Sequence, residues 1–107
     1  MVSEDRARQL ALALPEAVEK DHHGRPSFRV GDKIFATQWD EHHFNLMLDE
    51  GGILNAVQAA PETCAEVWWG KRLAAVRVDL RSVDAETFAD LLLDAWEGKA
   101  PRGLHRG

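Results

Sequence analysis

The segment SFRVGDKIFATQW at residues 27–39 constrains the fold more than any other part of the chain. Its first four residues alternate apolar Phe28 and Val30 with polar side chains, which is the period of a strand with one buried face. Gly31 and Asp32 follow, and they suit a two-residue hairpin turn because glycine tolerates the positive φ that such turns require. KIFATQW then predicts the returning strand, so the segment indicates an antiparallel hairpin with one face against a core.

Other short runs extend this hairpin into a larger sheet. The candidate strands are EAVEK at residues 16–20, HFNLML at 43–48 and AVRVDL at 75–80. A turn at Asp40 and Glu41 connects the hairpin to HFNLML. The two hairpin strands and HFNLML are therefore expected to form a three-stranded antiparallel meander.

Capping residues and apolar spacing predict three helices. The first runs from Glu4 to Leu14, behind the cap Ser3 and before Pro15, and the second runs from the cap Asp49 through Ile53 and Val57 to Ala60. The third contains Phe88, Leu91, Leu92, Ala95 and Trp96 and ends at Gly98. The last helix is the clearest, because its apolar residues recur at i, i+3, i+4, i+7 and i+8. A further short helical turn is expected after Pro61.

The order of these elements predicts an α+β fold in two layers, with an antiparallel sheet and helices packed on one face. One domain over residues 1–97 accounts for the pattern, and the basic residues 98–107 are expected to form a flexible tail. The length of 107 residues, with 45% hydrophobic and 29% charged residues, suits a single globular domain.

Several features indicate a cytoplasmic protein. No apolar run approaches the roughly 18 residues that a membrane-spanning helix needs. The start, MVSEDRARQL, carries acids where a signal peptide needs positive charge. The single cysteine, Cys64, leaves no internal disulfide to form. We therefore expect no membrane partner and favour a monomer.

The net charge of −5 argues against a general attraction to nucleic acid, but the basic residues are unevenly distributed. Residues 34–70 contain six acids and no Lys or Arg, whereas residues 71–81 contain four basic residues and one acid. Arg77 lies between two valines in a predicted strand, so it is expected to share the outer sheet face with Arg29. With Lys33, these residues predict a basic patch on the open face of the sheet.

Three stretches resemble the MmcQ/YjbR-like family: HHGRPSFRVGDKIFAT, GKRLAAVRVDL and LLLDAWE. The first is the most specific because its pattern is long, and the resemblance spans residues 3–97. It implies a compact α+β domain similar to the frataxin-like (CyaY-like) two-layer fold. It also implies DNA binding through two wing-like loops, and it points to no catalytic residues.

The candidate nucleic-acid-binding residues are cations that could contact phosphates, with one aromatic side chain that could stack on a base. They are Arg25, Arg29, Lys33, Lys71, Arg72 and Arg77, with Trp69. Two other interpretations stay open. Cations on an exposed sheet face maintain solubility and discourage edge pairing, and Trp68 and Trp69 could instead anchor a loop, one of them buried and the other free.

Metal and catalytic sites find little support. The histidine pairs, His22 with His23 and His42 with His43, match no recognised zinc spacing. Cys64 is expected on a short helix between two glutamates, which would raise the pKa of its thiol and oppose catalysis. We therefore expect no metal, no cofactor and no enzymatic activity.

The sequence favours a non-enzymatic DNA-binding domain that contacts phosphates weakly through the sheet face and the wing-like loops. The last helix is acidic on its outer side and would repel DNA, so DNA is expected to approach from the sheet. The alternative is a protein- or small-ligand-binding module that uses the sheet face and the Trp-bearing loop as an apolar pocket.

Overall fold

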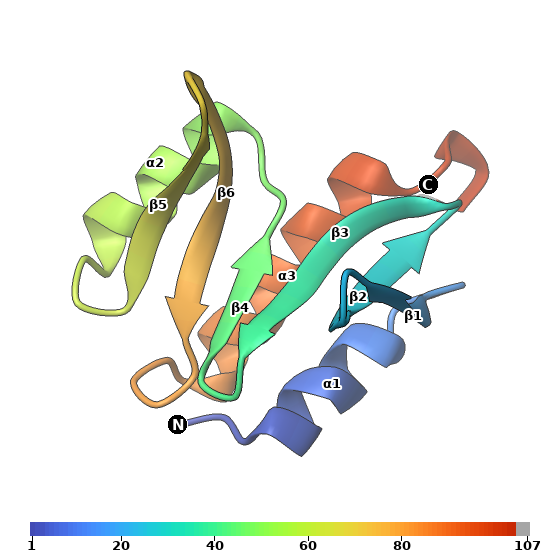
Figure 1. The fold of residues 1–107 in the computed structure, drawn as a ribbon, viewed down its shortest axis with the longest axis horizontal. Coiled ribbons are helices and arrows are strands. Elements are labelled where there is room, and N and C mark those ends of the chain that lie inside the picture. The colour runs from blue at the N-terminus through green and yellow to red at the C-terminus, as the bar shows by residue number, and fades with distance from the viewer. Residues whose placement is uncertain (105–107) are drawn as a thin grey trace.

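The computed structural model describes residues 1–104, and Figure 1 shows its helices and strands. In chain order the elements are α1 (Glu4–Leu12), β1 (Val18–His22), β2 (Arg25–Val30), β3 (Lys33–Asp40), β4 (His43–Leu46), α2 (Glu50–Ala59), β5 (Cys64–Trp69), β6 (Arg72–Asp79), α3 (Ala85–Lys99) and the 3₁₀-helix η1 (Arg102–Leu104). Ser3, Asp49 and Asp84 cap the three α-helices, because each side chain accepts a hydrogen bond from the backbone N–H three residues later.

The strands of the described residues form one antiparallel sheet in the order β1-β2-β3-β4-β6-β5. In Figure 1 α2 and α3 lie behind the sheet and α1 lies along its lower edge, so the face towards the viewer is open. Buried side chains of all three α-helices join those of the sheet in one hydrophobic core. The predicted α+β fold, with helices packed on one face of an antiparallel sheet, is confirmed. The narrower comparison with the frataxin-like fold stays a prediction.

The strand register places a row of apolar side chains on the side that faces the helices. Phe28 pairs with Ala36, and Ala36 pairs with Leu46 on the next strand. Leu46 in turn pairs with Val76, and all four residues are fully buried. Their burial fixes the register, because a slip of one residue would turn this row towards water.

The neighbouring row is polar and points to the open face. It consists of Ser27, Thr37, Asn45 and Arg77, which pair in this order across four strands. The Ser27 hydroxyl donates a hydrogen bond of 2.7 Å to the carbonyl of Lys20, and the Asn45 amide oxygen accepts one of 2.9 Å from Arg77 Nε. Ser27 and Asn45 are buried, so these bonds offset the cost of taking them out of water.

The structure corrects the prediction for residues 61–69. Instead of a short helix after Pro61, the chain makes a turn in which Cys64 N–H donates to the Ala60 carbonyl, and it then enters β5 directly. Cys64 therefore lies on a strand and not on a helix. The backbone groups of β5 pair with β6 in a hairpin, and this pairing decides the conformation where the local pattern was ambiguous.

Two helix ends also differ from the prediction. Helix α1 ends at Leu12 and not at residue 14, and α3 continues to Lys99, one residue beyond Gly98. After α3, Pro101 packs closely against the turn between β2 and β3. The contact is so close that a Cβ added to Gly31 would lie 2.8 Å from Pro101 Cγ. Leu104 of η1 packs against the core, so the predicted flexible tail contains packed residues up to this point, and residues 105–107 lie outside the described residues.

No helix within residues 1–104 is both long enough and apolar enough to cross a membrane.

Candidate functional site

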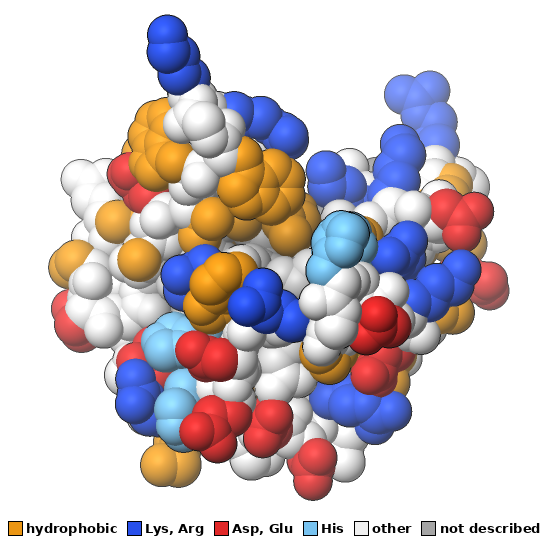
Figure 2. Space-filling view, viewed as in Figure 1, with side chains coloured by type: hydrophobic (Ala, Val, Ile, Leu, Met, Phe, Trp, Pro, Cys, Tyr) orange, Lys and Arg blue, Asp and Glu red, His pale blue; other side chains and the backbone are white. Residues whose placement is uncertain are grey.

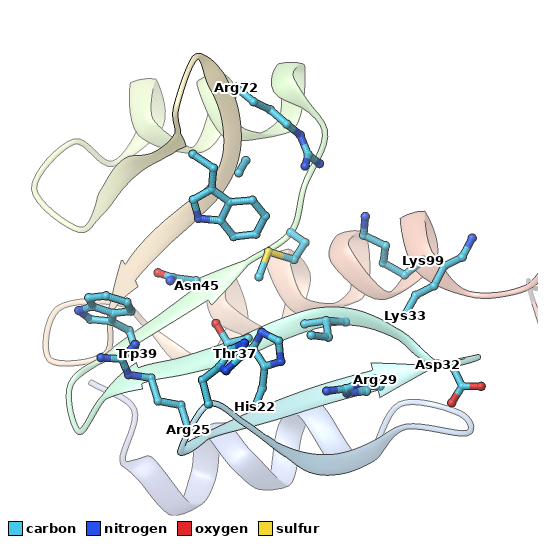
Figure 3. A pocket seen from close by; sticks show the side chains of 15 residues that line it. His22, Arg25, Arg29, Asp32, Lys33, Thr37, Trp39, Asn45, Arg72 and Lys99 are labelled. Carbon is cyan, nitrogen blue, oxygen red and sulfur yellow. The ribbon is translucent and has the colours of Figure 1, made fainter.

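A groove of about 650 Å³ opens on the uncovered face of the sheet, and Figure 3 shows the side chains that line it. It forms because β4 ends at Leu46, where it still pairs with Ala36 of β3 and Val76 of β6. Beyond this point β3 and β6 continue with no strand between them, and Figure 1 shows their ends diverging. The β2–β3 hairpin forms one side of the groove and the β5–β6 hairpin forms the other.

The groove is rich in cations. Among the described residues that line it, the basic side chains are Arg25, Arg29, Lys33, Arg72 and Lys99, and the acidic one is Asp32. In Figure 3 Arg72 reaches in from one side, Arg25 and Arg29 come from the other, and Lys99 lies near Lys33. Figure 2 shows Lys and Arg side chains around the hollow in this face. A locally positive surface therefore exists on a chain whose net charge is −5.

Arg29 and Arg77 point to the same face of the sheet, as the alternation predicted. Arg29 Nε donates a hydrogen bond of 3.1 Å to the Ser27 hydroxyl, and Arg77 Nε donates one of 2.9 Å to Asn45. Both acceptors are neutral, so these bonds orient the guanidinium groups without cancelling their charge. Burial lowers the pKa of Arg77 from its usual value, the nearby Asp40 carboxylate opposes this shift, and Arg25 adds to it. The group remains a cation at neutral pH.

Trp39 is a functional candidate that the sequence reasoning missed. The guanidinium carbon of Arg25 lies 4.0 Å from the centroid of its ring, and that of Arg77 lies 4.2 Å from it. These distances are typical of cation–π contacts. The alternation of the strand could have indicated it, because Trp39 lies two residues beyond Thr37, whose side chain points to the open face. Its link to Arg77 depends on pairing between distant strands.

Trp68 and Trp69 are both 53% exposed, so the alternative interpretation in which one of them is buried is wrong. They end strand β5 and point to opposite sides of the sheet. Trp69 lines the groove, and the Arg72 guanidinium lies 5.6 Å from its ring centroid. Trp68 lies outside the groove lining and donates a hydrogen bond of 2.9 Å from its indole nitrogen to Glu66.

The groove gathers most of the predicted site residues. It is lined by Arg25, Arg29, Lys33, Trp69 and Arg72. Arg77 lies next to it through its contact with Trp39, whereas Lys71 is in the turn of the β5–β6 hairpin, outside the lining. The sequence reasoning did not select Lys99, which α3 brings to the groove, or assign His22 and His23 to this surface.

Three titratable residues that could be considered for catalysis or metal binding, His43, Cys64 and Asp79, lie outside the groove lining. His43 contacts two carboxylates, with 2.8 Å to Asp40 and 3.8 Å to Asp79. Hydrogen bonds from Arg81 hold the pKa of Asp79 down at about 2. Cys64 is buried, and its burial, with the nearby Glu62, raises the pKa of its thiol. Within residues 1–104, no group of three or more His, Cys, Asp and Glu side chains is placed to hold a metal ion.

Comparisons with known proteins agree with the fold. A family model described as YjbR matches residues 12–98. The crystal structure of the Deinococcus radiodurans protein DR2400, described as carrying the family-model domain DUF419, superposes with a TM-score of 0.80 at 22% sequence identity. The match covers 99% of this chain and 84% of that one, and at this identity it shows a shared fold. No curated protein matches this chain.

Proposed function

The chain belongs to the YjbR family, and from the groove described above we propose that it is a non-enzymatic domain that binds DNA through its phosphates. One observation carries the proposal. The groove collects five Lys and Arg side chains against one Asp on a protein that is acidic as a whole. A concentration of cations that opposes the net charge indicates an anionic partner.

The position of the cations favours an extended polyanion. Lys33 stands on the β2–β3 side of the groove, Arg72 stands on the β5–β6 side, and both side chains are exposed. A phosphate chain that crosses the groove could contact both walls at once. Each phosphate contact releases condensed counterions, so binding of this kind supplies affinity without reading base sequence.

A second candidate function rests on the floor of the groove. Ile34, Met47 and Ala74 line it together with two tryptophans, and about 650 Å³ is within the range of small-ligand pockets. A small ligand or a protein side chain that uses this apolar floor would depend on Trp69 and respond weakly to salt. The two functions therefore predict different salt dependence.

Fluorescence anisotropy with a labelled DNA oligonucleotide at low and at physiological salt tests the proposal. We expect the logarithm of the affinity to fall linearly with the logarithm of salt concentration. Lys33→Glu combined with Arg72→Glu should make the slope of this line less negative by about two, because each lost phosphate contact changes the slope by about one. The control is Arg6→Glu with Arg8→Glu, which changes the net charge equally on exposed residues of α1, away from the groove. Because Arg8 pairs with Glu19, circular dichroism establishes that this variant stays folded.

Two results would contradict DNA binding at the groove. One is an affinity that does not change with salt. The other is an equal loss of affinity in the groove variant and in the α1 variant, because net charge alone would then explain the binding.

A further inference from the structure

The indole of Trp69 lies inside the proposed binding surface and is more than half exposed, at 53%. Large aromatic side chains usually bury most of their area, so an exposed indole in a groove is informative. Arg72 lies 5.6 Å from the ring centroid, which places a cation beside an aromatic surface. Proteins that bind single strands combine these two elements, since bases stack on the ring while cations contact the backbone.

The rest of the groove suits an unstacked base. Ile34, Met47 and Ala74 line the groove together with Trp69 and supply apolar surface, and cations lie on both of its walls. In a duplex the faces of the bases are covered by their neighbours, so a groove-lining indole cannot stack on them unless the helix is opened. A single strand presents its base faces and bends its backbone freely, so its phosphates can reach Arg29 and Lys33 on the opposite wall.

We infer that the groove binds single-stranded nucleic acid in preference to a duplex, with a base stacked on Trp69 and the flanking phosphates held by the cations around it. This inference rests on the proposed function and narrows its partner.

The neighbouring Trp68 provides a matched control within the chain. It has the same exposed fraction as Trp69, lies in the same strand and points away from the groove. The substitutions Trp69→Leu and Trp68→Leu therefore remove similar exposed rings from opposite sides of the sheet. A stacking role requires that only the first of them matters for binding.

Three DNA probes separate stacking from phosphate contact. They are a labelled single strand, the same strand annealed to its complement, and an abasic version that keeps every phosphate but lacks the bases. We expect the wild-type protein to bind the single strand most tightly. Trp69→Leu should weaken that binding by roughly five- to 150-fold, the range measured for loss of one stacked base. It should change duplex and abasic binding by less than about twofold, and Trp69→Phe should restore most of the loss.

The outcomes distinguish this inference from the proposed function. Equal or tighter binding of the duplex, or equal effects of Trp69→Leu and Trp68→Leu, would overturn the preference for single strands and leave phosphate binding in place. Failure to bind all three probes at low salt would overturn both. Circular dichroism of each variant establishes that a loss of affinity does not come from unfolding.

Discussion

The guanidinium group of Arg77 lies over the indole ring of Trp39, with 4.2 Å between its central carbon and the ring centroid. Asn45 holds the same guanidinium from the neighbouring strand through a hydrogen bond of 2.9 Å. Arg25 contacts the same indole from β2, at 4.0 Å. One aromatic ring thus fixes two cations that come from segments about 50 residues apart in the sequence.

Replacing Trp39 with leucine should therefore lower the free energy of unfolding. Two cation–π contacts at an exposed site are together worth about 1–2 kcal/mol. Urea denaturation of Trp39→Leu measures the loss, and Trp68→Leu is the control because Trp68 makes its hydrogen bond to Glu66 outside this cluster. Equal stability losses in the two variants would show that the ring contributes only apolar area.

The contact between Gly31 and Pro101 gives a second prediction. Gly31 has φ of +56° and would place a Cβ 2.8 Å from Pro101 Cγ, whereas Gly70 has φ of +64° and no heavy atom within 4 Å of such a Cβ. Gly70→Ala should cost about 1 kcal/mol through the left-handed backbone alone. Gly31→Ala should cost about 2–3 kcal/mol because a steric clash is added.

Adding Pro101→Ala to Gly31→Ala relieves that clash. In the Pro101→Ala background, Gly31→Ala should lower the free energy of unfolding by no more than Gly70→Ala does in the wild type. Urea unfolding of the single and double variants measures this in a double-mutant cycle. If the cost of Gly31→Ala is the same with and without Pro101, the chain end does not restrict this hairpin turn.

Asp79 predicts a specific acid sensitivity. Its pKa is held at about 2 by hydrogen bonds from Arg81, below the ordinary value of 3.8 that it regains on unfolding. A carboxyl group whose pKa is lowered by folding stabilises the folded state. This stability is fully present above pH 3.8 and is lost as the pH falls through about 2. The stability difference between the wild type and Asp79→Asn should therefore shrink progressively between these two pH values.

Urea unfolding at several pH values measures this difference. Arg81→Gln removes the two guanidinium hydrogen bonds but keeps the one from the backbone N–H of residue 81, so it should reduce the acid sensitivity in part. A difference that stays constant from pH 3.8 down to about 2 would mean that the carboxylate does not depend on Arg81.

Cys64 should react slowly with a thiol reagent in the folded protein. It is 3% exposed, and burial raises the pKa of its thiol, so both access and the thiolate fraction are low at neutral pH. We expect the folded protein to react about 100-fold more slowly than the protein in urea, or slower still. Equal rates in the two conditions would show that β5, an edge strand, opens freely.

Local patterns predicted the parts of the fold that local chemistry controls. The alternation around Gly31 and Asp32 placed the hairpin correctly, and both residues have positive φ in the turn. The two predicted cap residues, Ser3 and Asp49, begin the first two helices. The same alternation placed Arg29 and Arg77 on one face, since a strand with one buried side determines where every second residue points.

Pairing between strands and the packing of α3 determined the features that the sequence did not reveal. The start of β5 was taken for part of a short helix because proline followed by glutamate at residues 61–62 resembles a helix start, whereas hairpin pairing with β6 makes it a strand. Lys99 was missed because the packing of α3 brings it to the groove, and that packing has no local periodic signal. Trp39 follows the alternation of its strand, but its contact with Arg77 depends on pairing between strands far apart in the sequence.

The basic groove on an otherwise acidic protein makes the charge of the molecule asymmetric. A polyanion that approaches at low ionic strength would turn the protein before touching it, so that most first encounters occur on the open side of the sheet. The asymmetry of charge would therefore make association faster than random tumbling allows, and added salt would reduce that advantage because it screens charges that are more than about one Debye length apart.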